Sequence, residues 1–211
     1  MKKNSQILEL QYFGRIEAYS NLMNETNAYF LADLRYEKIL HPNRMMLAGS
    51  NGLVILTIPL AGGRNKKQLM REVELSYEQD WNKTHWRAIY TIYKKSPWFD
   101  EYAPALENLY KKKEQFLVNW NLKTMKWALE ALKLKLDILS LNSTEANTQS
   151  TKRSHQQENK MDALYPTYHQ VFMERQGFIA NLSILDLLFC CGPASNEYLQ
   201  KISNFYQELK K

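Results

Sequence analysis

The chain has 211 residues and a mass of 25.0 kDa, which is the size of one domain or of one domain with an appendage. Hydrophobic residues make up 45% and charged residues 24% of the sequence, and these typical values exclude collagen-like, wholly disordered and membrane-spanning chains. Glycine and proline number only 7 and 6, which argues against an all-β protein, and the formal charge of +6 attracts anionic partners only weakly.

The N-terminal residues predict a strand, a helix and a second strand. Large apolar side chains fill residues 7–13 up to Gly14, and they fill residues 28–34 again, as in buried strands. Between these runs, apolar residues recur at helical spacing, at Ile16, Tyr19, Leu22 and Met23. A strand, a helix and a strand over so short a stretch predict a βαβ unit with a parallel pair.

A β-hairpin is predicted next, because Asn51-Gly52 stands between the apolar runs 45–47 and 53–58. Pro59 indicates that the second strand leaves its sheet there. Residues 62–67 predict a mobile basic loop, and the alternation in residues 72–76 predicts a short half-exposed strand.

From Asp80 the apolar spacing becomes helical. One helix is predicted from Asp80 to Lys95, and a second from Pro104 towards Lys113. A third helix carries an apolar stripe of Leu122, Met125, Leu129, Leu132 and Leu136.

The last third of the chain divides into a polar and an apolar stretch. Residues 141–160 offer almost nothing to bury, so they predict a flexible loop. Residues 178–189 predict a buried helix, capped by Asn181 or Ser183, that stops at Gly192-Pro193. The final helix places four apolar residues on one side, namely Leu199, Ile202, Phe205 and Leu209.

These patterns predict a single domain over residues 1–211 of the α/β or α+β class. Its α/β part, residues 1–77, holds a βαβ-containing sheet and the hairpin. A helical part follows over 80–139, then the flexible loop at 141–160 and a C-terminal helical part over 164–211. We expect a ligand pocket between the strand ends and the helix that bears His85.

The cysteine pair and the N-terminus indicate the compartment. Cys190 and Cys191 are neighbours, which disfavours an ordinary disulfide, and we expect inert core residues. The first residues contain no apolar signal segment, and the longest apolar stretch, 53–61, is too short to cross a membrane. We therefore expect a cytoplasmic protein without a transmembrane segment.

His85 is the first candidate catalytic residue. The i, i+4, i+7 spacing places Trp81, His85 and Ala88 on the inward face of the helix. Because its pKa lies near neutrality, a histidine there suits general acid–base work if the site opens to a substrate. The alternative is a structural histidine held between aromatic rings.

Polar residues near strand ends are candidates for substrate binding. Asn43-Arg44 offers an amide and a guanidinium fork that can hold a carboxylate or phosphate, although an arginine beside a turn is usually solvated. Gln11 and Asp33 interrupt apolar runs near the ends of the predicted strands, where open α/β sheets bind ligands. Strand-end capping is the alternative for both.

Other chemistries find little support. Lys111-Lys112-Lys113 and the lysines that follow form a solvated helix face without arginine, so no nucleic-acid partner is predicted. The four histidines are scattered, no HExxH is present, and the adjacent cysteines lack CxxC spacing, so no metal site is predicted. No P-loop or GxGxxG occurs, and the cofactor stays unknown.

The order of several motifs suggests a family. Residues 11–13, Tyr36 with Asn43-Arg44, and the strand 56–59 are followed by Trp81 with His85-Trp86-Arg87, and by residues 93–99, 168–172 and 177–189. In these motifs nearly the whole chain resembles the WbqC-like protein family, which is associated with bacterial O-antigen and related surface-polysaccharide biosynthesis. Two positions depart from that pattern. Tyr12 follows Gln11 where the family usually has proline, and Cys190-Cys191 replaces an expected Asn-Glu pair.

The resemblance implies a pathway rather than a reaction. We expect an enzyme, a transferase, that acts on a sugar-nucleotide or aminosugar intermediate, with transfer of an acyl or aminoacyl group as the reaction considered. In this hypothesis His85 moves a proton, Arg44 holds an anionic group of the substrate, and the other substrate-binding residues are Gln11, Asn43, Trp81, Arg87 and Asp33. The partner is a small anionic molecule, either a sugar nucleotide or an acyl donor, and a homo-oligomer is compatible with this hypothesis.

Two alternatives belong to other classes. The Gln11-Tyr12-Phe13-Gly14 turn weakly resembles the nucleotide-binding turn of nucleotidyltransferases, which predicts binding of a nucleoside triphosphate. The other alternative is a non-catalytic scaffold, in which the lysine-rich helices or the C-terminal apolar segment dock a partner of the same pathway.

Overall fold

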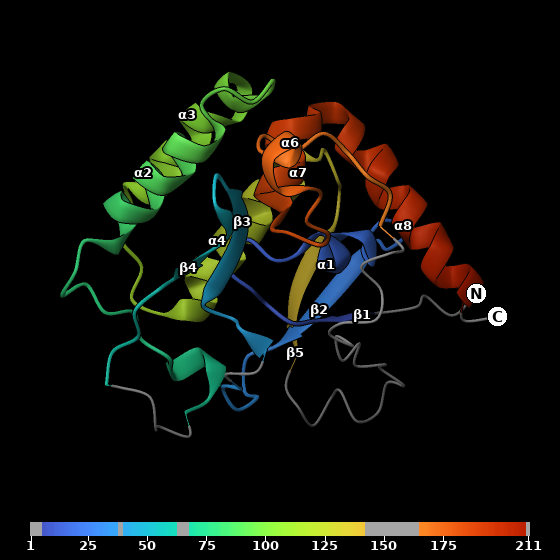
Figure 1. Cartoon of the computed structure of the whole chain (residues 1–211). Coiled ribbons are helices and arrows are strands. Elements are labelled where there is room, and N and C mark those ends of the chain that lie inside the picture. Colours follow the sequence, from blue (N-terminus) through green and yellow to red (C-terminus); the bar gives the residue numbers. More distant parts are fainter. Residues whose placement is uncertain (1–5, 38–39, 63–67, 142–164, 210–211) are drawn as a thin grey trace.

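The computed structural model describes residues 6–37, 40–62, 68–141 and 165–209. Strands are concentrated in the N-terminal part and helices dominate the remainder, so the predicted mixed α/β class is confirmed (Figure 1). In the described residues no helix is long and apolar enough to cross a membrane.

A three-stranded parallel sheet forms the first element of the fold. Its strands are β1 (Gln6–Leu8), β2 (Asn27–Leu31) and β5 (Asp137–Leu141), in the order β1-β2-β5. The helix α1 (Ile16–Ser20) connects β1 to β2, and these strands are parallel with Ile7 opposite Tyr29, so the predicted βαβ unit is confirmed.

Both predicted strands of that unit end early, because their continuations bond to other segments. The first strand was predicted to continue to residue 13, but β1 ends at Leu8. The Tyr12 amide donates to the Pro42 carbonyl instead of to a neighbouring strand. Likewise the carbonyls of Ala32 and Leu34, beyond the end of β2, accept from the amides of Arg71 and Met70.

The strand β5 was not predicted. The apolar stripe predicts that the third helix continues to Leu136. In the structure that helix ends at Ala131, and Lys133 has a left-handed φ of 54°. Residues 137–141 then join the sheet beside β2. The predicted flexible loop was therefore wrong at Leu141, and its other residues, 142–160, lie outside the described residues.

The hairpin is confirmed as β3 (Arg44–Gly49) and β4 (Gly52–Thr57), which pair antiparallel around Ser50 and Asn51. Gly52 has φ 110°, a conformation that favours glycine at this turn. The predicted strand at 72–76 was wrong. Residues 70–72 form the 3-10 helix η2 (Met70–Glu72), and Glu74 and Leu75 make only isolated bridges, to Phe116 and Leu60. Of the predicted basic loop, residues 63–67 lie outside the described residues.

Three helices form the middle of the chain. They are α2 (Trp81–Tyr93), α3 (Phe99–Tyr110) and α4 (Leu117–Ala131). The first begins directly after Asp80, as predicted. The second begins five residues earlier than predicted, so that Pro104 lies inside α3 rather than at its start. The third carries the predicted stripe from Leu122 as far as Leu129.

The C-terminal part packs around one apolar helix. Its elements are α6 (Met173–Gln176), α7 (Ile184–Cys191), the 3-10 turn η4 (Gly192–Ala194) and α8 (Ser195–Leu209). Of the two predicted caps, Ser183 is the one that accepts from the Leu185 amide. Residues 178–182 lie before α7. Their backbone is bonded to a side chain instead, since Gln170 Nε2 donates to the Ile179 carbonyl and Gln170 Oε1 accepts from the Ile179 amide.

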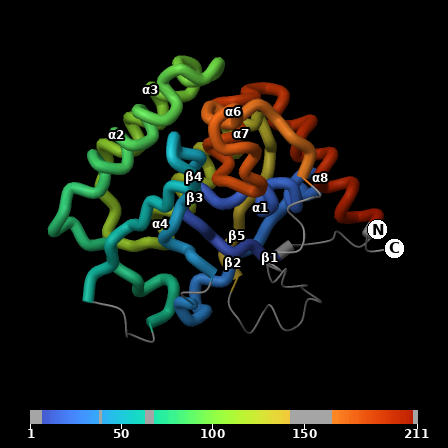
Figure 2. The backbone as a smooth tube through the Cα atoms, in the orientation of Figure 1, coloured from blue at the N-terminus to red at the C-terminus, as the bar shows by residue number. Residues whose placement is uncertain are grey.

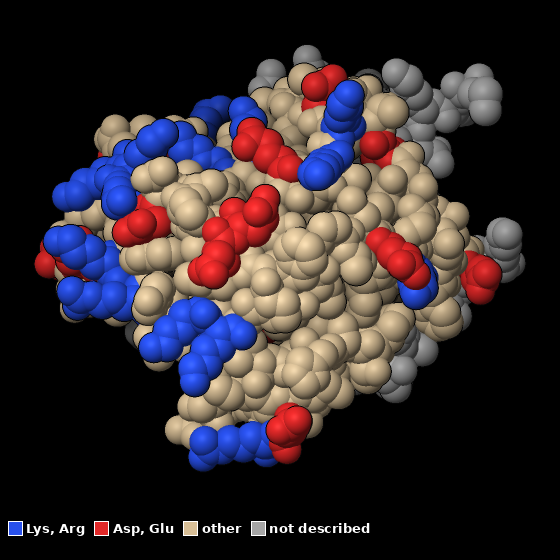
Figure 3. Space-filling view, turned by 90° about the horizontal axis from the view of Figure 1, so that it is seen from above, with Lys and Arg blue, Asp and Glu red and all other residues tan. Residues whose placement is uncertain are grey.

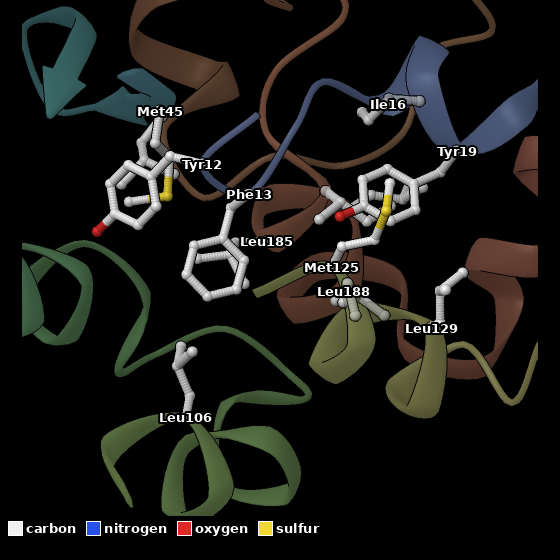
Figure 4. Packing of buried hydrophobic residues seen from close by; sticks show 14 of the residues in the cluster. Tyr12, Phe13, Ile16, Tyr19, Met45, Leu106, Met125, Leu129, Leu185 and Leu188 are labelled. Atoms are coloured by element: carbon white, nitrogen blue, oxygen red, sulfur yellow. The ribbon is translucent and has the colours of Figure 1, made fainter. Parts of the chain in front are cut away.

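The hydrophobic core lies around α7. This helix contacts α1, α3, α4, α8 and β3, and residues 184–189 are buried, as their apolar run predicts. Figures 1 and 2 show α2 and α3 side by side on one flank, α8 on the opposite flank, and the parallel sheet between them. In Figure 4, Phe13 points towards Leu106 and Leu185, which belong to α3 and α7.

The junction between α7 and η4 gives a test of this packing. Gly192 has φ 53°, and a Cβ there would lie 2.2 Å from the Trp98 ring. We expect Gly192→Ala to lower the free energy of unfolding by about 1–3 kcal/mol, from overpacking and backbone strain. Gly177→Ala is the control, because Gly177 has φ 78° but nothing within 4 Å of the added Cβ. Equal losses in chemical denaturation would show that contact with Trp98 is unimportant.

Candidate functional site

The loop between β1 and α1 is held by an asparagine from a distant helix. Asn121 on α4 is fully buried, and its Nδ2 donates to the carbonyl oxygens of Leu10 at 3.1 Å and Pro42 at 2.8 Å. The amide of Tyr12 donates to the same Pro42 carbonyl at 3.1 Å. These bonds place the β1–α1 loop against the segment that leads into β3.

The other side of that loop is bonded to the segment before α7. Ser183 Oγ donates to the Phe13 carbonyl at 2.8 Å, and the Ile184 amide donates to the Gly14 carbonyl at 3.0 Å. The Ser183 amide in turn donates to the Met46 carbonyl of β3 at 2.9 Å. Three segments that are far apart in sequence therefore meet at one point.

A small cavity opens at this meeting point, and we name it the cationic pocket. Its volume is about 10 Å³, which is room for about one water-sized group. Its lining comprises Gln11, Phe13, Arg15, His41, Arg44, Met45, Met46 and Ser183. Because two of these residues are arginines, the pocket suits one oxygen atom of a phosphate or carboxylate.

Backbone strain is concentrated in the same lining. Phe13 has φ 41° and His41 has φ 48°, and both line the cationic pocket. A left-handed conformation is unfavourable for a non-glycine residue and persists only where surrounding contacts impose it. Such strained residues gather at functional sites, so their position supports the cationic pocket as a binding site.

A second cavity lies at the carboxyl ends of β1 and β2, and we name it the apolar cleft. Its volume is about 50 Å³, and residues 7–11, 30–31 and 34–35 contribute to its lining. Gln11 lines both cavities, and its Nε2 donates to the Leu40 carbonyl at 3.0 Å. The structure therefore places Gln11 where the sequence predicted a ligand, beyond the end of a parallel strand.

His85 lies in a cluster of aromatic rings. Its Nδ1 is 3.0 Å from the Tyr12 hydroxyl, which is also hydrogen-bonded to the Tyr110 hydroxyl. The rings of Tyr12 and Trp81 lie 5.7 and 5.3 Å from the imidazole, centre to centre. Burial lowers the pKa of His85 to about 4, so its imidazole is neutral at physiological pH.

The other predicted residues divide between these environments. Arg44 lines the cationic pocket together with Gln11, so the structure brings these two together. Both ends of the Asn43 amide are bonded within the protein, since Nδ2 donates to the Ile58 carbonyl at 2.8 Å and Oδ1 accepts from the Tyr36 hydroxyl at 3.2 Å. Trp81 packs with His85 in the aromatic cluster, near Trp120. The remaining two, Asp33 and Arg87, line neither the cationic pocket nor the apolar cleft.

Sequence reasoning missed Arg15, His41 and Asn121. No pattern in the sequence marks Arg15 or His41, because strained loops bring them to the pocket. Asn121 does have a signal. It is a polar residue at the start of the helix that carries the apolar stripe, and it is buried there.

A buried carboxylate was also missed. Asp186 on α7 accepts hydrogen bonds from the hydroxyls of Tyr93 and Tyr168, both at 2.6 Å, and from Gln170 Nε2 at 3.2 Å. Burial raises the pKa of this carboxyl group. The group fastens α2 and residues 168–170 to α7, which is a structural task.

The cysteines show no sign of activation. Burial raises the pKa of both thiols, to about 11 for Cys191, so the thiolate nucleophile is scarce. Within the described ranges, no three His, Cys, Asp or Glu side chains come together to hold a metal ion.

Two lysines of the predicted lysine-rich stretch have acidic partners. Lys111 pairs with Glu107 at 3.5 Å, and Lys123 pairs with Glu114. Figure 3 shows basic side chains gathered towards one side of the face seen from above, with acidic side chains among and beside them.

Comparison with known protein families assigns the chain to one of them. The model of the WbqC-like protein family matches residues 11–163, well over half of the sequence. The chain belongs to the WbqC-like protein family. The matched region begins at Gln11 and contains the whole lining of the cationic pocket except Ser183. No curated protein and no solved structure matches the chain.

Asn121 gives a stability test of the site. We expect Asn121→Ala to lower the free energy of unfolding by about 1–3 kcal/mol, because the buried Leu10 carbonyl loses the Asn121 donor while the Pro42 carbonyl keeps only the Tyr12 amide. Asn24→Ala is the control, since Asn24 is exposed and makes one bond of 3.3 Å to Ser203. Urea denaturation measures both variants. A loss for Asn121→Ala no larger than the control's would refute the bracing role.

The burial of His85 predicts a pH dependence of stability. The pKa falls from 6.5 to about 4 in the folded state, so the unfolded chain binds the proton more readily. The contribution of neutral His85 to the free energy of unfolding is complete above about pH 6.5. About 2–3 kcal/mol of this free energy is lost as the pH falls from 7 to 4. Urea denaturation across this range should show a shallower decline for His85→Phe than for the native chain. Parallel curves would contradict the lowered pKa.

Proposed function

We propose that this WbqC-like protein is an enzyme of bacterial surface-polysaccharide biosynthesis, in the O-antigen class of pathways. Its substrate in this proposal is an anionic sugar-nucleotide or aminosugar intermediate. The observation that carries the proposal is the cationic pocket, where Arg15 and Arg44 line a cavity of strained backbone within the family region. Its size suits one oxygen of a phosphate or carboxylate group.

The residues then take the following roles. Arg44 and Arg15 hold the anionic group, and Gln11 orients the neighbouring part of the substrate between the two cavities. Asn43 keeps Arg44 in place, because its amide bonds fix the chain just before β3. Asp33, Trp81 and Arg87 remain predicted substrate-binding residues.

The reaction we propose is transfer of an acyl or aminoacyl group to the amine of the sugar. A bond forms between the amine nitrogen and the acyl carbon, the bond from that carbon to the donor's leaving group breaks, and the amine loses a proton. We propose His85 as the residue that moves this proton, although neither it nor its partner Tyr12 lines the two cavities. Turnover of an identified substrate by His85→Ala within a few-fold of the native rate would refute that role.

Ligand binding tests the anion site directly. A ligand at about 100 times its Kd stabilises the folded state by about 2.7 kcal/mol, which raises the Tm by several degrees. We expect nucleotide sugars to raise the Tm of the native chain and of Arg71→Ala, whose arginine is exposed and outside the pocket. The same ligands should not raise the Tm of Arg44→Ala.

Other outcomes point elsewhere. A shift with nucleoside triphosphates alone favours the nucleotidyltransferase-like alternative. An unchanged Tm with every ligand, in a cooperative melt, favours the scaffold alternative. One observation favours the scaffold alternative. The side chains of Leu53 and Ile55 on β4 are 50% and 44% exposed, and exposed apolar side chains can bind a partner protein.

A further inference from the structure

The apolar cleft lies where parallel sheets place ligands. Its lining comes from the end of β1 and the residues after it, and from the end of β2 and the residues after it. In open α/β sheets the crevice beyond the carboxyl ends of the strands is the usual ligand site. The position of the cleft alone therefore indicates a ligand, without saying which.

Its walls decide the chemistry of that ligand. They are mainly aliphatic, with Leu8, Leu31, Leu34, Leu40, Met70 and Val118 among the lining residues. A sugar ring carries a hydroxyl on most of its carbon atoms, and each hydroxyl that leaves water without a partner carries a penalty. The polar side chains of the lining are only four, Glu9, Gln11, Arg35 and Glu37, and of these Arg35 and Glu37 are exposed.

The size of the cleft narrows the choice further. A volume of about 50 Å³ is several times the space that one water needs. It fits a chain of a few carbon atoms.

The cleft is also adjacent to the cationic pocket. Gln11 lines both cavities, and residues 40–42 line the two in turn, with Leu40 and Pro42 on the cleft and His41 on the pocket. A ligand with an anionic group and a short hydrocarbon chain matches this pair of cavities.

We infer that the apolar cleft binds the hydrocarbon chain of a short acyl group, beside the anionic group held in the cationic pocket. This inference rests on the proposed function and assigns the acyl chain of the donor to the apolar cleft. Unsubstituted sugars do not occupy the cleft.

Two methionines allow each cavity to be observed separately. Met70 lines the cleft and Met46 lines the cationic pocket. In the full chain with 13C-labelled methionine methyl groups, NMR titrations use sodium acetate, butyrate and hexanoate, and separately inorganic phosphate. Met70→Leu and Met46→Leu assign the two signals.

We expect the Met70 methyl signal to shift with butyrate and hexanoate, and the Kd to fall by up to about fourfold for each added methylene until the cleft is full. Phosphate should shift the Met46 signal. Leu34→Trp, which fills the cleft, should remove the dependence on chain length and leave the phosphate response intact. Val118→Phe is a second filling variant. Leu122→Trp, a half-buried leucine of α4 outside the cleft, should behave as the native chain does.

The outcomes separate the two proposals. If phosphate shifts the Met46 signal but the Kd of the carboxylates does not depend on their chain length, the acyl site is overturned and the anion site stands. A chain-length series at Met70 with no Met46 response to phosphate supports the acyl site and overturns the cationic pocket. Silence of both signals overturns both, and a chain-length series that persists in Leu34→Trp and Val118→Phe overturns the assignment to the cleft.

Discussion

The structure around the candidate site depends on the satisfaction of two buried carbonyl groups. Leu10 and Pro42 are buried residues, the first in the loop after β1 and the second in the segment before β3. The Asn121 side chain donates to both carbonyl oxygens, and an unpartnered buried carbonyl would cost about 1–3 kcal/mol. Because one amide serves both segments, the loop after β1 and the segment before β3 cannot move independently.

This constraint explains why the site is strained and where its charge lies. Phe13 follows the braced residues and is fastened on its other side by Ser183, so its backbone is fixed at both ends in a left-handed conformation. His41 precedes the braced Pro42 and is strained in the same way. The turn at Phe13 brings Arg15 to the side of the loop that faces Arg44. Two cations are thus placed beside one small cavity by backbone geometry, in a chain whose overall charge is only +6.

Local patterns predicted the elements whose causes are local. The βαβ unit, the Asn51-Gly52 hairpin and the start of α2 after Asp80 follow from periodicity and turn residues, and all three are present, although the Asp80 side chain does not cap the helix. The strand β5 was missed because its pairing partner, β2, is more than 100 residues away, and Leu136 continues the helical spacing by coincidence. Of the site, Gln11 and Arg44 were found because polar residues beside strands are visible in the sequence. Arg15 and His41 were not, since only long-range hydrogen bonds bring them there.

The sequence Gln11-Tyr12-Phe13 shows how one short loop serves three environments. Gln11 lies between the two cavities, Tyr12 reaches His85, and Phe13 packs into the core beside Trp127. Tyr12 makes two of these contacts itself, because its amide donates to the Pro42 carbonyl and its hydroxyl is hydrogen-bonded to His85 Nδ1. A proline at this position would have neither the amide hydrogen nor the hydroxyl. Because Nδ1 is engaged with Tyr12, the ring nitrogen Nε2 is the atom that His85 has left for another partner.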